Sequence, residues 1–206
     1  MITFIINWFF YFIVLSFITK SSVISSKIIS LTHAITTILG TLYILLNENW
    51  DYDNFDVSKL WLIQFSTSYF IYDCLFMIIH SFSIMFFLHH ILILIVYFFL
   101  LYYDYGAKLL MYTVFWGEIT NPLQISWFLS KYLKYKKIEE LLFPIFSFNF
   151  ILIRSIILPY IHYNLIQTLF RTNEHYYINT IISILSILGS IGGLIWVKNI
   201  IYKLIK

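Results

Sequence analysis

Residues 87–96, with the sequence FLHHILILIV, place two adjacent histidines, His89 and His90, in a run that is otherwise apolar. Apolar stretches of about 17 to 20 residues are typical of helices that cross a membrane, and this run belongs to such a stretch. Each imidazole ring carries a hydrogen-bond donor and an acceptor that need partners once water is excluded. The stretch therefore predicts a membrane span, and it predicts polar partners for both histidines elsewhere in the chain.

The composition of the whole chain agrees with a membrane protein. Of its 206 residues, 61% are hydrophobic and 11% are charged, whereas about a quarter of the residues of a soluble domain are charged. This composition excludes a soluble globular protein, and the small net charge of +3 gives no support to nucleic-acid binding. The single cysteine, Cys74, excludes an intramolecular disulfide and any cysteine-based zinc site.

Apolar stretches recur along the chain and predict an all-α integral membrane protein with about seven transmembrane helices. We expect these helices at residues 2–18, 28–46, 60–79, 86–103, 109–129, 141–160 and 177–200. The first stretch has no basic segment before it and no small-residue cleavage site after it. We therefore interpret it as a retained span and not as a cleaved signal peptide.

Charged residues are distributed unequally between the two sides that alternating spans would create. One side carries Lys20, Lys27, Lys131, Lys134, Lys136, Lys137, Lys198, Lys203 and Lys206. The other side carries mostly acids, namely Glu48, Asp51, Asp53, Asp56, Asp104 and Glu174, with Lys59, Lys108 and Arg171. Because cytosolic loops are enriched in lysine and arginine, we expect a lumenal or external N-terminus and a cytosolic C-terminus.

Few ionisable residues fall at membrane depth, and each needs a partner or a wet cavity there. They are His33, Asp73, His89, His90, Glu118 and Arg154. With a rise of about 1.5 Å per residue, the predicted spans put them in two layers. His33, Asp73 and the histidine pair form a layer near the cytosolic side, and Glu118 and Arg154 form a layer near mid-membrane.

Two prolines lie beside the deeper layer. Pro122 has no N–H to donate to the carbonyl of Glu118, four residues earlier, and Pro159 stands in the same relation to Ser155, next to Arg154. Free carbonyls at membrane depth are tolerated where protein groups or cavity water satisfy them. The two prolines therefore predict opened helices around a polar cavity.

The chemistry of these groups leaves alternatives open. One imidazole of the histidine pair could act as a general base or nucleophile, with Asp73 orienting it, or the pair could be a structural hydrogen-bonding element. Glu118 and Arg154 could form a salt bridge between neighbouring spans or a clamp for a lipid headgroup. Adjacent histidines do not have the spacing of a helical metal site, so we expect no metal and no other cofactor. His80, His162 and His175 are interpreted as interfacial.

Five short segments together resemble a known family. They are SLTHA (30–34), YFIYD (69–73), FLHH (87–90), EITNPLQISW (118–127) and RSIILP (154–159). Their order and types resemble the TLC (TRAM–LAG–CLN homology) domain family, in particular its small TLC-domain-only membrane proteins. The resemblance implies an N-terminal transmembrane helix at residues 1–22 and a six-helix TLC-type membrane domain at residues 23–206. It also implies an endoplasmic-reticulum or related endomembrane protein that handles or senses lipids.

The resemblance assigns the polar residues to a lipid-binding cavity that influences membrane lipid composition. The expected cavity residues are His33, Asp73, His89, His90, Glu118, Asn121 and Arg154, and the expected partner is a membrane lipid, with acyl-chain and sphingoid lipids as candidates. The alternative is a ceramide-synthase-like N-acyltransferase, in which His89, His90 and Glu118 would be catalytic. Those enzymes carry two aspartates three residues apart where this chain has Glu118 and Asn121. This departure favours a lipid-binding role without catalysis.

Overall fold

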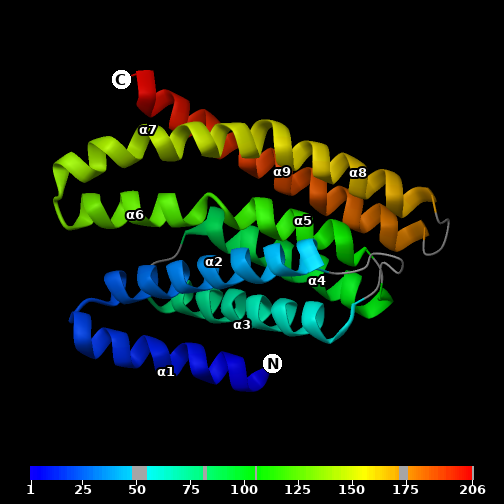
Figure 1. The fold of residues 1–206 in the computed structure, drawn as a ribbon, viewed down its shortest axis with the longest axis horizontal. Helices are drawn as coiled ribbons and strands as arrows, with labels where there is room; N and C mark the ends of the chain where they lie inside the picture. The colour runs from blue at the N-terminus through cyan, green and yellow to red at the C-terminus, as the bar shows by residue number, and fades with distance from the viewer. Residues whose placement is uncertain (48–54, 81–82, 105, 172–175, 206) are drawn as a thin grey trace.

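The computed structural model describes all residues except 48–54, 81–82, 105, 172–175 and 206 (Figure 1). The described residues form α1 (Ile2–Thr19), α2 (Ser22–Asn47), α3 (Val57–His80), α4 (Ile84–Tyr103), α5 (Ala107–Glu118), α6 (Asn121–Tyr132), α7 (Lys136–Leu152), a π-helical turn η1 (Ile153–Ile157), α8 (Leu158–Arg171) and α9 (Tyr176–Ile205). No strand occurs among them. The expected all-α fold is confirmed.

Seven helical passes make up the described bundle. Six of them are long and apolar enough to cross a membrane, namely α1, α2, α3, α4, the continuous rod at residues 136–171, and α9. The seventh pass consists of α5 and α6, which lie end to end (Figure 1) and are separated by Ile119 and Thr120. The chain is thus a multipass membrane bundle, as predicted.

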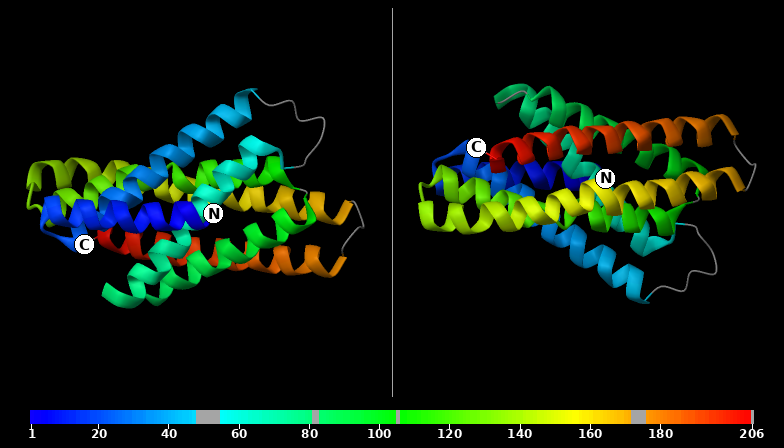
Figure 2. Two further views of the ribbon diagram at one scale, coloured as in Figure 1. Left: turned by 90° about the horizontal axis from the view of Figure 1, so that it is seen from below. Right: turned by 90° about the horizontal axis from the view of Figure 1, so that it is seen from above.

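Successive passes run in opposite directions, so the connections alternate between the two ends of the bundle (Figure 1 and Figure 2). The end of α1, the start of α2, the α6–α7 turn and the end of α9 lie at the same end. We call this the lysine-rich end, because it carries Lys20, Lys27, Lys131, Lys134, Lys136, Lys137, Lys198 and Lys203. The predicted segregation of the lysines is therefore present in the fold.

The outside of the bundle is apolar, and its interior contains many small polar side chains. Phe10, Phe17, Phe148 and Ile156 are between 61% and 86% exposed, which is unfavourable in water and costs nothing in lipid. Small polar residues are buried between helices, for example Ser25, Thr37, Thr41, Ser66 and Ser68. This inversion is typical of helix packing in membranes, where small and hydroxyl-bearing residues allow close approach and hydrogen bonding.

Helix α1 packs on the outside of the bundle against α2 and α3 (Figure 1). Trp8 is the one buried residue of this helix. Its indole packs against Phe65 and Tyr69 of α3, with ring centroids 5.0 Å and 5.7 Å away, and its Nε1 donates a hydrogen bond to Ser68 Oγ at 3.1 Å. Phe4, Phe9 and Phe12 also pack against aromatic rings of α3. Trp8 is therefore the most deeply buried of several aromatic contacts that attach the first pass to the rest.

Several helices extend beyond the boundaries expected from hydropathy, two of them by six residues or more. Helix α2 begins at Ser22 and not at residue 28, and α8 ends at Arg171 and not at residue 160. The apolar window marks only the part of a helix that must lie in hydrocarbon, and polar residues continue the helix past it. As a result, His33 lies 11 residues inside α2, and His162 lies in the second turn of α8.

Candidate functional site

A cavity of about 690 Å³ lies within the bundle and is lined by residues from every described helix except α1. Its volume falls in the range of about 300 to 1,000 Å³ that is typical of small-molecule sites. All seven residues expected at the site line it, namely His33, Asp73, His89, His90, Glu118, Asn121 and Arg154. The fold therefore gathers around one cavity residues that lie up to 121 positions apart in the sequence.

His90 lies beside Asp73, as the sequence predicts. Its Nδ1 is 3.3 Å from Asp73 Oδ2, but the groups are not aligned for a hydrogen bond, and Nδ1 has no such partner among the described residues. The His90 ring also lies 4.8 Å from the Phe70 ring. His89 lines the same cavity and packs edge-on against Trp196 of α9 at 5.2 Å. His89 and His90 therefore both face the cavity, and of the two only His90 lies near a carboxylate.

Glu118 has two close polar partners. Asn121 Nδ2 donates a hydrogen bond to Glu118 Oε2 at 2.7 Å, and His33 Nδ1 lies 3.8 Å from the same oxygen. His33 is fixed in turn, because its Nε2 is 3.0 Å from Ser66 Oγ and its ring stacks on Tyr69 at 3.8 Å. With 1% of His33 and 9% of Glu118 exposed, this group is largely enclosed by protein.

The expected separation into two layers is wrong for His33. The sequence places it beside Asp73 near the lysine-rich end, whereas the structure pairs it with Glu118. The reason is the early start of α2 at Ser22, which puts His33 about 17 Å along the helix axis. The two layers are thus an Asp73–His90 pair and a deeper His33–Glu118–Asn121 group.

Arg154 lines the cavity together with Glu118, and the sequence left a salt bridge and a headgroup clamp open for the two residues. Within the described part of the chain, no ion pair of 4.0 Å or less joins these two residues. Instead, one terminal nitrogen of Arg154 donates a hydrogen bond to the carbonyl of Gly117 at 3.0 Å, and the guanidinium lies 5.3 Å from the Phe150 ring. Arg154 thus satisfies a backbone carbonyl next to the interruption between α5 and α6, and its Nε has no hydrogen-bond partner among the described residues.

The two prolines open the helices in different ways. Pro122 stands in the first turn of α6, directly after the break between α5 and α6, so the predicted interruption beside Glu118 is confirmed. Upstream of Pro159 the helix is not broken but widened, because Leu158 N–H bonds to Ile153 O across the π-helical turn that contains Arg154. Such turns are rare and are frequent at functional sites.

A comparison with protein families matches this chain to the TLC domain over residues 23–202. The chain belongs to the TLC domain family. The match begins at the start of α2, so α1 lies outside it. Neither the comparison with curated proteins nor the comparison with solved structures finds a match.

Several residues that line the cavity of this TLC domain were not expected there. Lys27 was interpreted only as a determinant of orientation, but it is part of α2 and its Nζ lies 5.2 Å from the Phe128 ring. His162 was expected at the interface, which is wrong, since its Nδ1 lies 2.8 Å from Ser190 Oγ in the cavity wall. His80 also lines the cavity. The expectation for His175 lies outside the described residues.

No sequence signal distinguishes Lys27 or His162 from ordinary interfacial residues, because their placement depends on helix ends that hydropathy does not define.

The described residues of the TLC domain offer no obvious metal centre. Among the residues that the structure describes, no three histidine, cysteine, aspartate or glutamate side chains are grouped so that they could hold an ion. The described residues bring carboxylates, imidazoles and the cations Lys27 and Arg154 to the cavity.

Proposed function

We propose that this TLC domain binds a membrane lipid in its cavity and thereby influences membrane lipid composition. The observation that carries the proposal is the division of the cavity wall. Polar groups, among them Lys27, His90 and Arg154, line one part of it. Apolar side chains line the part that leads away from the lysine-rich end, where Leu100, Leu110 and Val114 meet. A headgroup and an acyl chain would match these two parts.

Buried polar atoms that lack hydrogen-bond partners support the binding of a headgroup at the polar part of the cavity. Within the described residues, His90 Nδ1 and Arg154 Nε are buried and lack hydrogen-bond partners. A buried polar group without a partner costs about 1 to 3 kcal/mol, and more in a medium that excludes water. A headgroup that offers acceptor oxygens, or water that accompanies it, would remove this cost. Binding at this position would therefore stabilise the bundle.

In keeping with the positive-inside rule, we propose that the lysine-rich end faces the cytosol and the N-terminus faces the lumen. For the membrane itself, we propose the endoplasmic reticulum or a related endomembrane, in keeping with the resemblance of the sequence motifs. The polar part of the cavity would then open toward the cytosolic leaflet, and the acyl chain would extend toward the lumenal side.

One observation favours a second candidate function. Asp73 approaches His90 to 3.3 Å, close enough that a rotation of the ring would let the carboxylate orient the imidazole for proton transfer. In an N-acyltransferase, His90 would accept the proton of a sphingoid amine, and Glu118 would supply the remaining acidic group. Lipid analysis of cells with and without the protein separates the two functions. A change confined to N-acylated sphingoid species would favour the enzyme, and a broad change in phospholipids would favour the lipid-binding role.

Two glycines of α9 provide a matched test of lipid binding. A side chain added at Gly189 meets no atom within 4 Å and would project into the cavity, which Gly189 lines. Gly192 is equally unobstructed but is not part of the cavity wall. We expect Gly189→Leu to weaken lipid binding about fivefold or more, because overpacking a site costs about 1 kcal/mol at least. Gly192→Leu should bind lipid as the wild type does.

The measurement is native mass spectrometry of the purified full chain, which counts the lipid molecules that each variant retains in detergent. After the lipid has been removed, both variants should unfold at the wild-type temperature or slightly above it, since both gain helix propensity. Equal lipid retention by all three proteins would exclude the cavity as the binding site.

A further inference from the structure

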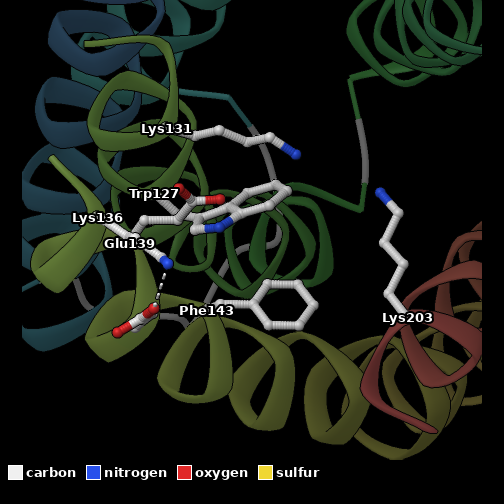
Figure 3. Close-up of a pocket in the computed structure, with 7 residues that line it drawn as sticks. Trp127, Lys131, Lys136, Glu139, Phe143 and Lys203 are labelled. Carbon is white, nitrogen blue, oxygen red and sulfur yellow. Dashed lines mark ion pairs between the residues drawn. The ribbon is translucent and has the colours of Figure 1, made fainter. Parts of the chain in front are cut away.

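A second, shallower cleft lies at the lysine-rich end, between the α6–α7 turn and the end of α9 (Figure 3). Its volume is about 390 Å³. Trp127 of α6 forms its centre, and three lysines from three helices surround the ring, namely Lys131, Lys136 and Lys203. The cleft is separate from the intramembrane cavity, although the Trp127 ring lines both.

Two of the lysines converge on the same indole. Lys131 Nζ lies 5.6 Å from the Trp127 ring centre, and Lys203 Nζ lies 5.8 Å from it. Figure 3 shows both side chains pointing toward the ring, from α6 and from α9. Among the described residues, neither ammonium group has a carboxylate within 4.0 Å. Two positive charges thus lie beside one indole, and neither is paired with a carboxylate among the described residues, so an anion that contacts both would be favoured.

Two acidic residues also line the cleft and limit the charge of the anion that it can bind. Glu140 lies 3.9 Å from Lys136 Nζ, the pair drawn with a dashed line in Figure 3. Glu139 also lines the cleft. Three lysines against two glutamates leave one net positive charge, which suits a single phosphate group better than a polyphosphate.

Packing and backbone geometry hold the cleft in shape. The Trp127 ring stacks on the buried ring of Phe146 at 5.8 Å and lies 5.2 Å from Phe143. The turn that joins α6 to α7 is closed by a hydrogen bond of 2.8 Å from Tyr135 N to Ser130 O. The lysine on α6 and the lysine on α7 are therefore presented on a fixed hairpin, so little order is lost when a ligand binds.

We propose that this cleft binds the phosphate group of an anionic membrane lipid, with Lys131 and Lys203 as its principal contacts. Tryptophan and lysine side chains at the end of a transmembrane bundle lie at headgroup level. A membrane lipid therefore presents its phosphate at the depth of the cleft, with its chains along the outside of the bundle. This site is distinct from the intramembrane cavity and does not depend on the function proposed for it.

The test measures thermal stabilisation of the purified full chain in a neutral detergent during titration with dioctanoyl phosphatidate. Dioctanoylglycerol, which lacks the phosphate, is the control lipid, and inorganic phosphate is the control anion. We expect a saturable increase in Tm with phosphatidate alone. In Lys131→Gln/Lys203→Gln the midpoint concentration should rise by about 30-fold, or roughly fivefold for each lysine near the headgroups.

A charge-matched control uses two lysines of the same hairpin that do not line the cleft, Lys134 and Lys137. Lys134→Gln/Lys137→Gln should respond to phosphatidate as the wild type does. An equal loss in both double variants would show diffuse attraction and overturn the proposal, as would an equal response to inorganic phosphate. A response that disappears in Gly189→Leu would place the lipid in the intramembrane cavity and would also overturn it.

Discussion

Glu118→Leu is expected to lower the free energy of unfolding by about 2 to 4 kcal/mol, since it removes the acceptor shared by two neighbours. Asn121 Nδ2 would lose its 2.7 Å hydrogen bond, and His33 Nδ1 would lose the carboxylate at 3.8 Å. Both groups face a site from which most water is excluded, so neither recovers a partner easily. The measurement is an unfolding titration with sodium dodecyl sulfate in mixed micelles.

Glu118→Gln separates the hydrogen bond from the charge. Its amide oxygen can still accept from Asn121, so its stability should lie within about 1 kcal/mol of the wild type. Lipid retention should nevertheless fall, because the cavity loses its deeper carboxylate. If Glu118→Leu were as stable as the wild type, the group formed by His33, Glu118 and Asn121 would not contribute to folding.

Trp8→Ala is expected to loosen the packing of α1 against the bundle at a cost of about 2 to 3 kcal/mol. In soluble proteins, the same truncation in a core costs about 3 to 5 kcal/mol, part of which is transfer of the side chain from water. In a bilayer that transfer is absent, and the lost packing and the cavity remain. The lost contacts are those with Phe65 and Tyr69 and the hydrogen bond to Ser68.

Two further variants of α1 serve as controls for Trp8→Ala. Trp8→Phe should cost about 1 kcal/mol, because it keeps an aromatic ring and loses the hydrogen bond to Ser68. Phe10→Ala removes a ring that is 66% exposed and should not change stability measurably. Limited proteolysis in detergent reports the state of α1 directly, since a detached helix is cut early. If Trp8→Ala and Phe10→Ala were equally protected from proteolysis, Trp8 would not be the residue that holds α1 in place.

The passes of the bundle were predictable because hydropathy reports which residues must lie in hydrocarbon. The gathering of the polar residues was predictable for a related reason. An ionisable side chain such as Asp73 or Glu118 is too costly facing lipid, so residues of this kind turn toward a common interior. The interruption of the helix beside Pro122 was also predicted correctly. A missing N–H acts locally, so its effect can be predicted without knowing the neighbouring helices.

The pairing within the cavity was not predictable, because it depends on helix ends and on local backbone geometry. An earlier start of α2 by six residues moved His33 by almost two turns and changed its partner to Glu118. The π-helical turn shifted Arg154 relative to the expected α-helical register, and Gly117 became its acceptor. Lys27 entered the cavity wall for the same reason as His33.

Photoactivatable lipid in native membranes tests the central claim most directly. Leu100, Leu110 and Val114 are at most 5% exposed and line the apolar part of the cavity, so a chain in the surrounding bilayer cannot reach them. Phe148 and Ile184 face outward and are 68% and 52% exposed. With a phospholipid that carries a diazirine near the end of one acyl chain, we predict labelling of the three enclosed residues as well as the outward ones. Labelling confined to the outward residues would contradict the claim that a lipid occupies the cavity.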